Sequence, residues 1–247
     1  MSLDLEKLVK ETIQESLSGL LDSGLEESNI NSKVEEKTNQ DLNEAYVTAA
    51  PKFDLKTELL SDKNKKAHQE NLEGYVEKLN KVSAKLDSID RSEVNSNHSD
   101  FRNLKLDETY NHNAAFLHGL FFHNISDLNS QISMNSLSFM KLERDFGSFD
   151  NWQEDFIACA LASRNGWVIT AYNTQIRRYV NLMVDLHSNN VMIGCQPIIV
   201  LDCWEHTYYR DYLNNRKAYV HAMMKELNWN VIEKRIEKSE MIHKLLG

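Results

Sequence analysis

Cysteine is scarce in this chain, with 3 among 247 residues. So small and odd a number does not form the disulfide framework of a small secreted protein. Cys159, Cys195 and Cys203 lie in apolar stretches. We therefore expect three buried free thiols and a reducing compartment.

Proline is also rare, with 2 residues, which suits a largely helical protein. No apolar run in the sequence approaches the roughly 20 residues that a membrane-spanning helix needs. The first residues lack the basic start and the apolar core of a signal peptide. We therefore expect a cytoplasmic protein without a membrane partner.

Charge is distributed unevenly along the chain. The formal net charge is −9, but residues 1–55 hold 12 acidic and 5 basic residues and account for −7 of it, which leaves −2 for the rest. With 41% hydrophobic and 26% charged residues, the chain can form one globular domain with an appendage. We expect no nucleic-acid partner for so acidic a chain.

The first 55 residues differ from the rest. Apolar residues recur there at intervals of four, at Leu5, Val9, Ile13, Leu17 and Leu21. This spacing predicts one short amphipathic helix, and the polar, acidic residues 26–48 predict a flexible linker. Two interpretations stay open: a disordered tail whose helix is transient, or a tag that docks the protein on a partner protein.

One short segment combines a carboxylate and an imidazole. Asp202 ends the apolar run of residues 198–201, which predicts a buried strand, and His206 begins a polar and aromatic stretch that predicts a helix. Both side chains can therefore point into one pocket and bind a metal ion. Taken alone the pair is weak, because Asp202 could merely cap the helix and a single histidine is more often a surface or packing residue.

The surrounding residues point to a family. The run Asp-x-Trp-Glu-His-x-Tyr-Tyr-x-Asp-Tyr over residues 202–212 resembles the C-terminal signature of the iron/manganese superoxide dismutases. Four other segments resemble that family in the same order: residues 60–80, 110–125, 143–152 and 164–168. The resemblance covers roughly residues 56–240 and leaves the N-terminal extension unmatched.

The resemblance implies four metal ligands, His68, His118, Asp202 and His206, holding one manganese or iron ion per chain. His68 stands seven residues before Tyr75, whereas the commonest family pattern has eight. Seven residues are close to two helical turns, so His68 and Tyr75 share a face. Three imidazoles and one carboxylate with an open position suit a redox-active metal better than structural zinc. His112 and His123 do not fit the pattern.

The resemblance also implies four residues beside the metal. Tyr75 and His187 would hold the metal's solvent and pass protons, Trp167 would line the site, and Glu205 would pair with His206 of a second chain in a homodimer. Each has a plainer alternative: Trp167 as a core aromatic, His187 as a solvated turn residue, and Glu205 as a surface acid at a helix N-terminus.

Metal choice stays open at this point. Ala114 stands four residues before His118, where iron-type members carry glutamine. With His187 as a donor later in the chain, this favours manganese or tolerance of either metal. The potential depends on hydrogen bonds and solvent exposure that a sequence does not show.

The expected fold class is α+β, with an N-terminal long helical hairpin followed by an α/β domain that contains a three-stranded antiparallel sheet. The predicted domains are an extension (1–55), a hairpin domain (56–128) and an α/β domain (129–247). Predicted helices cover residues 60–86, 110–124, 136–145, 151–164, 207–227 and 230–246, with a polar connection at 87–106. Predicted strands cover residues 167–172, 179–186 and 196–201.

Two functions remain open from the sequence. The first is a superoxide dismutase that converts superoxide to dioxygen and hydrogen peroxide. The second is a structural or interaction protein on the same fold, with weak or no metal binding, docked through its N-terminal helix. Two features keep the second open: the shifted position of His68, and residues that depart from the family at the expected dimer interface.

Overall fold

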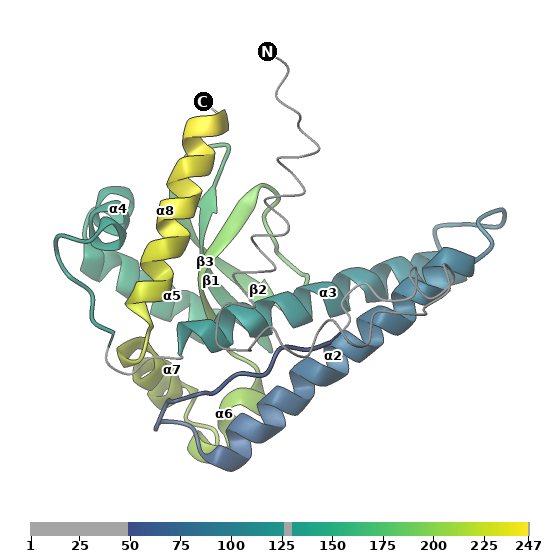
Figure 1. Ribbon diagram of the computed structural model, residues 1–247, viewed down its shortest axis with the longest axis horizontal. Helices are drawn as coiled ribbons and strands as arrows, with labels where there is room; N and C mark the ends of the chain where they lie inside the picture. The colour runs from purple at the N-terminus through teal and green to yellow at the C-terminus, as the bar shows by residue number, and fades with distance from the viewer. Residues whose placement is uncertain (1–48, 126–129, 247) are drawn as a thin grey trace, which may run out of the picture.

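A computed structural model describes residues 49–125 and 130–246, and Figure 1 shows their arrangement. The predicted N-terminal helix and the predicted linker, residues 26–48, lie outside these ranges. Along the described chain the elements are α2 (Asp62–Ser88), α3 (Asp100–Asn124), α4 (Leu137–Phe146), α5 (Phe149–Ala162), β1 (Gly166–Asn173), β2 (Arg178–Asp185), β3 (Cys195–Asp202), α6 (Glu205–Tyr212), α7 (Arg216–Lys225) and α8 (Trp229–Leu246). The predicted α+β class is confirmed.

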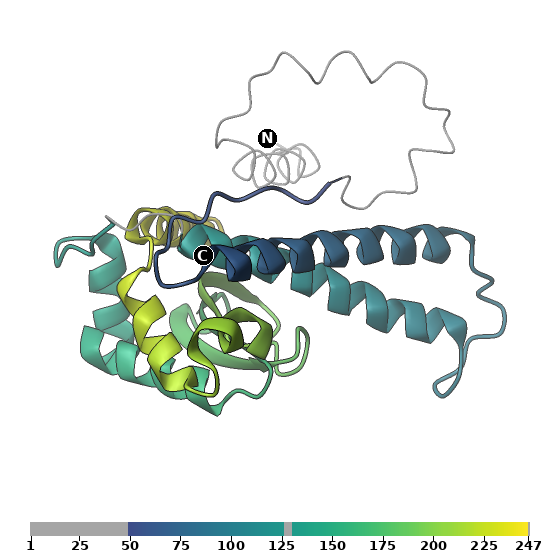
Figure 2. The same ribbon diagram turned by 90° about the horizontal axis from the view of Figure 1, so that it is seen from below.

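Helices α2 and α3 form a long hairpin that extends away from the rest of the molecule (Figures 1 and 2). The Ser61 hydroxyl begins α2 by accepting a hydrogen bond from the backbone N–H of Asn64. The side chains that α2 buries recur every three or four residues, as one face of an amphipathic helix requires, and they include His68, Leu72, Val76 and Leu79. His68 therefore lies on the face that packs against the protein.

The predicted connection between the hairpin helices, residues 87–106, is too long. Helix α3 begins at Asp100 rather than Tyr110. Ser99 caps this earlier start through a hydrogen bond from the backbone N–H of Arg102, and Asp100 stabilises the first turn. The first turns of α3 are mostly exposed, so they show no apolar periodicity from which the helix could be predicted.

The sheet has strand order β2-β1-β3 with all neighbours antiparallel. Every residue of the central strand β1 is buried. Its first residue is Gly166, where an added Cβ would lie only 2.0 Å from the backbone oxygen of Val184. Glycine is therefore required for the close approach of β1 and β2 at this end. The next residue, Trp167, pairs with Asp202 of β3, so these two side chains begin from adjacent backbone positions.

Helices pack against the sheet, and one of them, α3, belongs to the hairpin. Helix α5 contacts β1 and β2, and both α3 and α8 contact β3. Inside this packing the Trp152 indole N–H donates to the Thr170 hydroxyl at 2.8 Å. None of the described helices is both long and apolar enough to cross a membrane.

One helix predicted from the sequence, residues 207–227, is instead two helices, α6 and α7. The break lies at Leu213, whose φ of 51° is in the left-handed region and ends α6. Asn215 then caps α7, with its side chain accepting from the backbone N–H of Ala218. Neither glycine nor proline marks this break in the sequence.

Candidate metal centre

Four side chains from four elements converge at the junction of the hairpin and the sheet. His68 comes from α2, His118 from α3, Asp202 from the last position of β3 and His206 from the first turn of α6. The Asp202 Oδ2 atom lies 3.0 Å from His68 Nε2, 3.6 Å from His118 Nε2 and 3.4 Å from His206 Nε2. One potential ligand atom from each residue lies within 4.8 Å of the other three, which is the spacing of donors around a single ion.

The orientation of two of these side chains is set by the backbone around them. His118 Nδ1 lies 2.6 Å from the carbonyl oxygen of Ala114, one turn earlier in α3, and a ring nitrogen facing a carbonyl must donate. The neutral ring therefore carries its proton on Nδ1, and the Nε2 lone pair faces the cluster. Asp202 accepts the backbone N–H of Trp204 on Oδ1 at 2.8 Å, which leaves Oδ2 directed at the imidazoles.

The buried polar atoms of the cluster fit a metal ion. His118 Nε2 and His206 Nε2 are buried and have no hydrogen-bond partner among the described residues, an arrangement that is costly unless a ligand is bound. Burial lowers the pKa of His68 and, helped by the charge of His68, lowers that of His118 well below its usual range. Burial alone would raise the pKa of Asp202, but the neighbouring imidazoles of His206 and His68 outweigh it and hold that pKa well below its usual range.

These pKa shifts favour neutral imidazoles at His68 and His118 and an ionised carboxylate at Asp202. Metal ligands need these protonation states, because each then presents a lone pair to the ion. Cysteine is absent from the cluster, so the donor set is the nitrogen and oxygen set that suits manganese and iron. One such ion fits here, and His68, His118, Asp202 and His206 are the residues that would hold it.

A hydrogen-bonded chain lies beside the cluster. The Trp167 indole donates to His187 Nδ1 at 3.0 Å, and His187 Nε2 lies 3.1 Å from the Tyr75 hydroxyl. The rings of Trp167 and Tyr75 contact the His118 ring edge-on and tilted, at centroid distances of 4.9 and 5.2 Å. His187 and Trp167 are fully buried, so the alternative of a solvated turn histidine does not describe His187.

The other residues considered from the sequence lie as follows. Glu205 is exposed in the first turn of α6, and no described contact links it to the cluster. His112 is exposed, and the ring of His123 packs edge-on against Phe53 at 4.9 Å. Neither His112 nor His123 belongs to the cluster.

Two aromatic residues of the site were missed in the sequence. Trp204 stacks on His187 with centroids 4.8 Å apart and on His206 with centroids 5.7 Å apart. Tyr110 lies edge-on to His187 at 4.6 Å. The position of Trp204 between Asp202 and His206 was a usable signal, and so was that of Tyr110, the first residue of the predicted helix 110–124.

The free cysteines are partly as expected. Cys203 is buried, but Cys159 and Cys195 are half-buried, and none of the three is in a disulfide. The expectation that all three are buried is wrong for those two. Each stands on an element face that packs only partly against the core, because α5 and the start of β3 lie near the surface.

The molecule is a helical hairpin packed on an α+β unit, and between them lies a cluster of three histidines and one carboxylate that could hold a single metal ion. Residues 136–235 match the family described as iron/manganese superoxide dismutases, C-terminal domain. The chain is 36% identical over 176 residues to the iron superoxide dismutase of Aquifex aeolicus, an alignment that covers 70% of this chain and 82% of that protein. The chain belongs to the iron/manganese superoxide dismutase family.

Of two further relatives, one is named for iron and the other for manganese. The iron superoxide dismutase of Cupriavidus metallidurans is 33% identical over 173 residues, covering 69% of this chain and 85% of that protein. The manganese superoxide dismutase 1 of Halobacterium salinarum is 29% identical over 172 residues, covering 70% and 84%. Family membership therefore leaves the choice between iron and manganese open.

Proposed function

We propose that this protein is a superoxide dismutase that converts superoxide to dioxygen and hydrogen peroxide at a mononuclear manganese or iron site. The observation that supports this most strongly is the convergence of His68, His118, Asp202 and His206, with two imidazole nitrogens left unpartnered and facing Asp202 Oδ2. A bound iron or manganese ion would supply the one-electron chemistry, taking an electron from one superoxide and giving it to a second.

The chain's own residues would manage protons, since forming hydrogen peroxide takes up two. The Trp167 indole can only donate, so His187 Nδ1 must accept, and the neutral His187 ring then carries its proton on Nε2. Burial lowers the pKa of His187 to about 4, so the ring is neutral around pH 7. Its single N–H therefore donates to the Tyr75 oxygen.

This assignment determines what Tyr75 can do. Its oxygen accepts from His187, so its own hydroxyl proton stays available for another acceptor on the side of the cluster. Burial raises the pKa of Tyr75, which keeps that proton in place at neutral pH. Tyr75 would thus hold and hand on protons by hydrogen bonding, a role that needs reach rather than basicity.

The proposal includes a homodimer. His206 is the most exposed of the four ligands, with 25% of its side chain accessible, and Glu205 beside it is exposed. A second copy that covered this face would let each Glu205 pair with the partner's ligand histidine and fix its orientation from behind. A cytoplasmic location also remains our proposal, supported by three cysteines that form no disulfide.

Metal choice belongs to the same proposal. The residue one turn before His118 is Ala114, which offers only its carbonyl, so the donor beside the cluster is the Tyr75 hydroxyl, whose oxygen His187 holds. We propose that the site accepts either metal and works better with manganese. No observation favours the alternative of an inactive interaction protein, because His68 lies in the cluster despite its shifted spacing.

The test is to strip the purified protein of metal, reload parallel samples with manganese or iron, and measure superoxide loss in each. Activity that appears with either metal supports the proposal, and absence of activity with both refutes it. His118→Ala should abolish metal uptake and activity, whereas His112→Ala, an exposed change in the same helix, should leave both at the wild-type level.

A further inference from the structure

The ligand His206 stands on the shortest helix of the described chain. Helix α6 has only 8 residues, and its N-cap residue Trp204 forms no side-chain capping hydrogen bond. Only Thr207 and Tyr208 of this helix are buried. Isolated helices shorter than roughly 12 residues are marginal in water, so α6 depends on contacts with the rest of the protein. The position of the His206 ring therefore depends on what holds α6 in place.

A single side chain joins α6 to α2, the helix beside it that carries His68 (Figure 1). The Nδ2 atom of Asn64 donates to the backbone carbonyl of Thr207 at 2.7 Å and to Asp211 Oδ2 at 2.9 Å. Asn64 is only 1% exposed and stands one turn before His68. Thr207 directly follows His206. The Asn64 amide thus connects the two segments that carry these ligands.

The chemistry of this bridge requires an amide. A backbone carbonyl and an ionised carboxylate only accept hydrogen bonds, so the atom of Asn64 that faces them must be the NH2 group, which has two protons to donate. Asp211 also accepts the backbone N–H of Ser61 at 2.9 Å. Burial opposes ionisation of Asp211, but the hydrogen bonds from Asn64 and Ser61 outweigh it and lower its pKa. The carboxylate is therefore ionised near neutral pH and holds the Asn64 amide in this orientation.

Other hydrogen bonds between α6 and this part of the chain are farther from the ligand. The Tyr212 hydroxyl and the Arg210 guanidinium donate to backbone carbonyls near the start of α2, at 2.8 and 3.3 Å. Both residues lie in the second half of α6. The bond from Asn64 to Thr207 is buried, so losing it would leave a carbonyl without that donor and away from water. Asn64 is thus the contact best placed to fix the first turn of α6.

We propose that Asn64 is a positioning residue of the metal centre, which sets where the His206 ring lies by fixing the first turn of α6 against α2. This inference rests on the proposed metal-dependent function. His206 Nε2 lies 3.4 Å from Asp202 Oδ2 and has no hydrogen-bond partner among the described residues, so the ring depends on the backbone of α6 to reach the ion. The acceptors of Asn64 are not ligand side chains, so Asn64 acts through His206.

The test compares the wild type with Asn64→Ala and with a matched control, Asn111→Ala. Asn111 is also a buried asparagine of the hairpin, 6% exposed, but its amide donates within its own helix, to Asp107 O at 2.7 Å. The proteins are loaded with manganese, or with iron if manganese is not retained. Two quantities are measured, neither of which needs superoxide: the rate of metal loss to excess chelator, and the EPR spectrum of the bound ion, which depends on ligand geometry.

We expect metal loss to be about 10-fold faster in Asn64→Ala than in the wild type, since one hydrogen bond is worth up to roughly a factor of ten in an equilibrium constant. The EPR spectrum of Asn64→Ala should also change. Asn111→Ala should match the wild type in both measurements, even if it is less stable to heat.

A second pair of variants tests the hydrogen bonds themselves. Asn64→Asp keeps the shape of the side chain but places a carboxylate oxygen against two acceptors, so it should lose metal faster than Asn64→Ala. Adding Asp211→Asn restores a donor opposite this carboxylate. The double variant should therefore retain metal longer than Asn64→Asp alone, a coupling expected only of residues in contact. Absence of this recovery would refute the hydrogen-bonded bridge.

The outcomes separate this inference from the proposed function. Rates and spectra of Asn64→Ala equal to those of Asn111→Ala would overturn the role of Asn64 even if the wild type is an active dismutase. Faster metal loss and a changed spectrum in Asn64→Ala alone would support that role even if the metal-loaded wild type does not consume superoxide. A wild type that retains neither manganese nor iron would refute both.

Discussion

Replacing the carboxylate of Asp202 by an amide gives the clearest expected effect on the metal centre. Asp202→Asn preserves shape, so the remaining oxygen can keep the hydrogen bond from the backbone N–H of Trp204. It removes the only negative charge in the cluster. Losing one partner of a buried, charge-paired group costs about 3–5 kcal/mol. At 1.4 kcal/mol per factor of ten, metal affinity should fall by roughly 100-fold to 5,000-fold.

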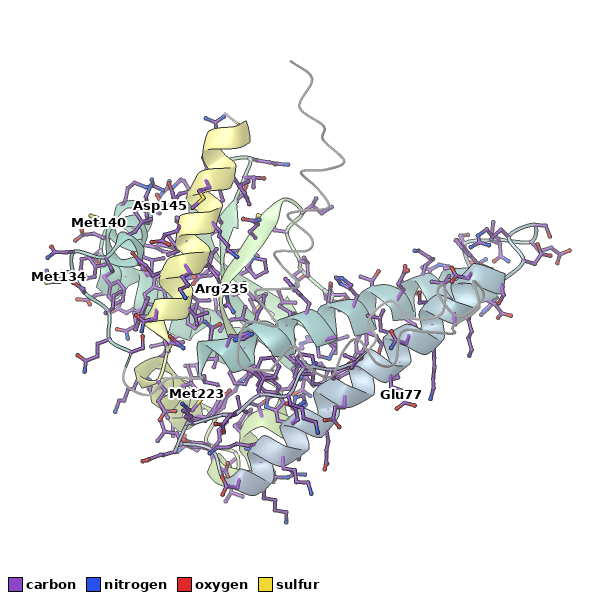
Figure 3. All side chains as sticks on the ribbon, viewed as in Figure 1. Glu77, Met134, Met140, Asp145, Met223 and Arg235 are labelled. Carbon is purple, nitrogen blue, oxygen red and sulfur yellow. The ribbon has the colours of Figure 1, made fainter. Side chains whose placement is uncertain are left out.

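The assay is competition with chelators of graded affinity, followed by elemental analysis of the protein. A matched control is Asp145→Asn, since the Asp145 side chain is only 3% exposed and accepts hydrogen bonds from Tyr179 and Arg144. Figure 3 shows Asp145 beside α4 and α8, away from α6. Asp145→Asn should lower thermal stability and keep full metal. Metal affinity in Asp202→Asn equal to that of the wild type would refute the ligand assignment.

Three further changes test other parts of the account. His187→Ala should retain metal but lower turnover by about 10-fold to 100-fold, because Tyr75 loses its donor; unchanged kinetics would argue against the proton route. Burial raises the pKa of Tyr179, whose hydroxyl forms hydrogen bonds with Ser239 and Glu240. Above pH 10 the unfolded state therefore binds fewer protons than the folded state. The free energy of unfolding then falls by up to about 1.4 kcal/mol per pH unit for each such tyrosine. Tyr179→Phe should show a shallower fall in chemical denaturation between pH 10 and 12, and an identical slope would contradict this sign. Deleting residues 1–55 should leave turnover per bound metal unchanged, and a metal-loaded but inactive truncation would show that the extension belongs to the catalytic unit.

Much of the site could be anticipated because its residues lie on strongly patterned elements. His68 shares the apolar face of α2, and Asp202 ends a strand whose last five residues are buried. Periodicity therefore identified which way these side chains point. The convergence of the two helices with β3 was expected only from the resemblance to a known family.

The two errors in helix boundaries share one physical cause, which is that exposed helix ends and breaks depend on backbone geometry rather than on apolar pattern. The early start of α3 depends on the cap at Ser99, and the gap between α6 and α7 depends on the left-handed backbone of Leu213. Neither leaves a periodic signal.

Contacts between distant elements also left no local signal. Arg235 of α8, which Figure 3 labels near α3, donates to Leu120 O and Asn124 Oδ1 of α3 and to Ile198 O of β3. It thus ties together the two elements that carry His118 and Asp202. Burial lowers the pKa of Arg235 to about 10. Such a buried guanidinium reads in a sequence as an ordinary surface residue.

The central claim is that His68, His118, Asp202 and His206 hold one ion together. The most direct measurement is the metal-to-chain ratio of the purified full-length protein, determined by elemental analysis after exhaustive dialysis. We expect one manganese or iron ion per chain, lost in His68→Ala, the variant at the ligand whose spacing departs from the family pattern. A folded wild-type protein with no bound metal, or a His68→Ala protein with the full amount, would contradict the claim.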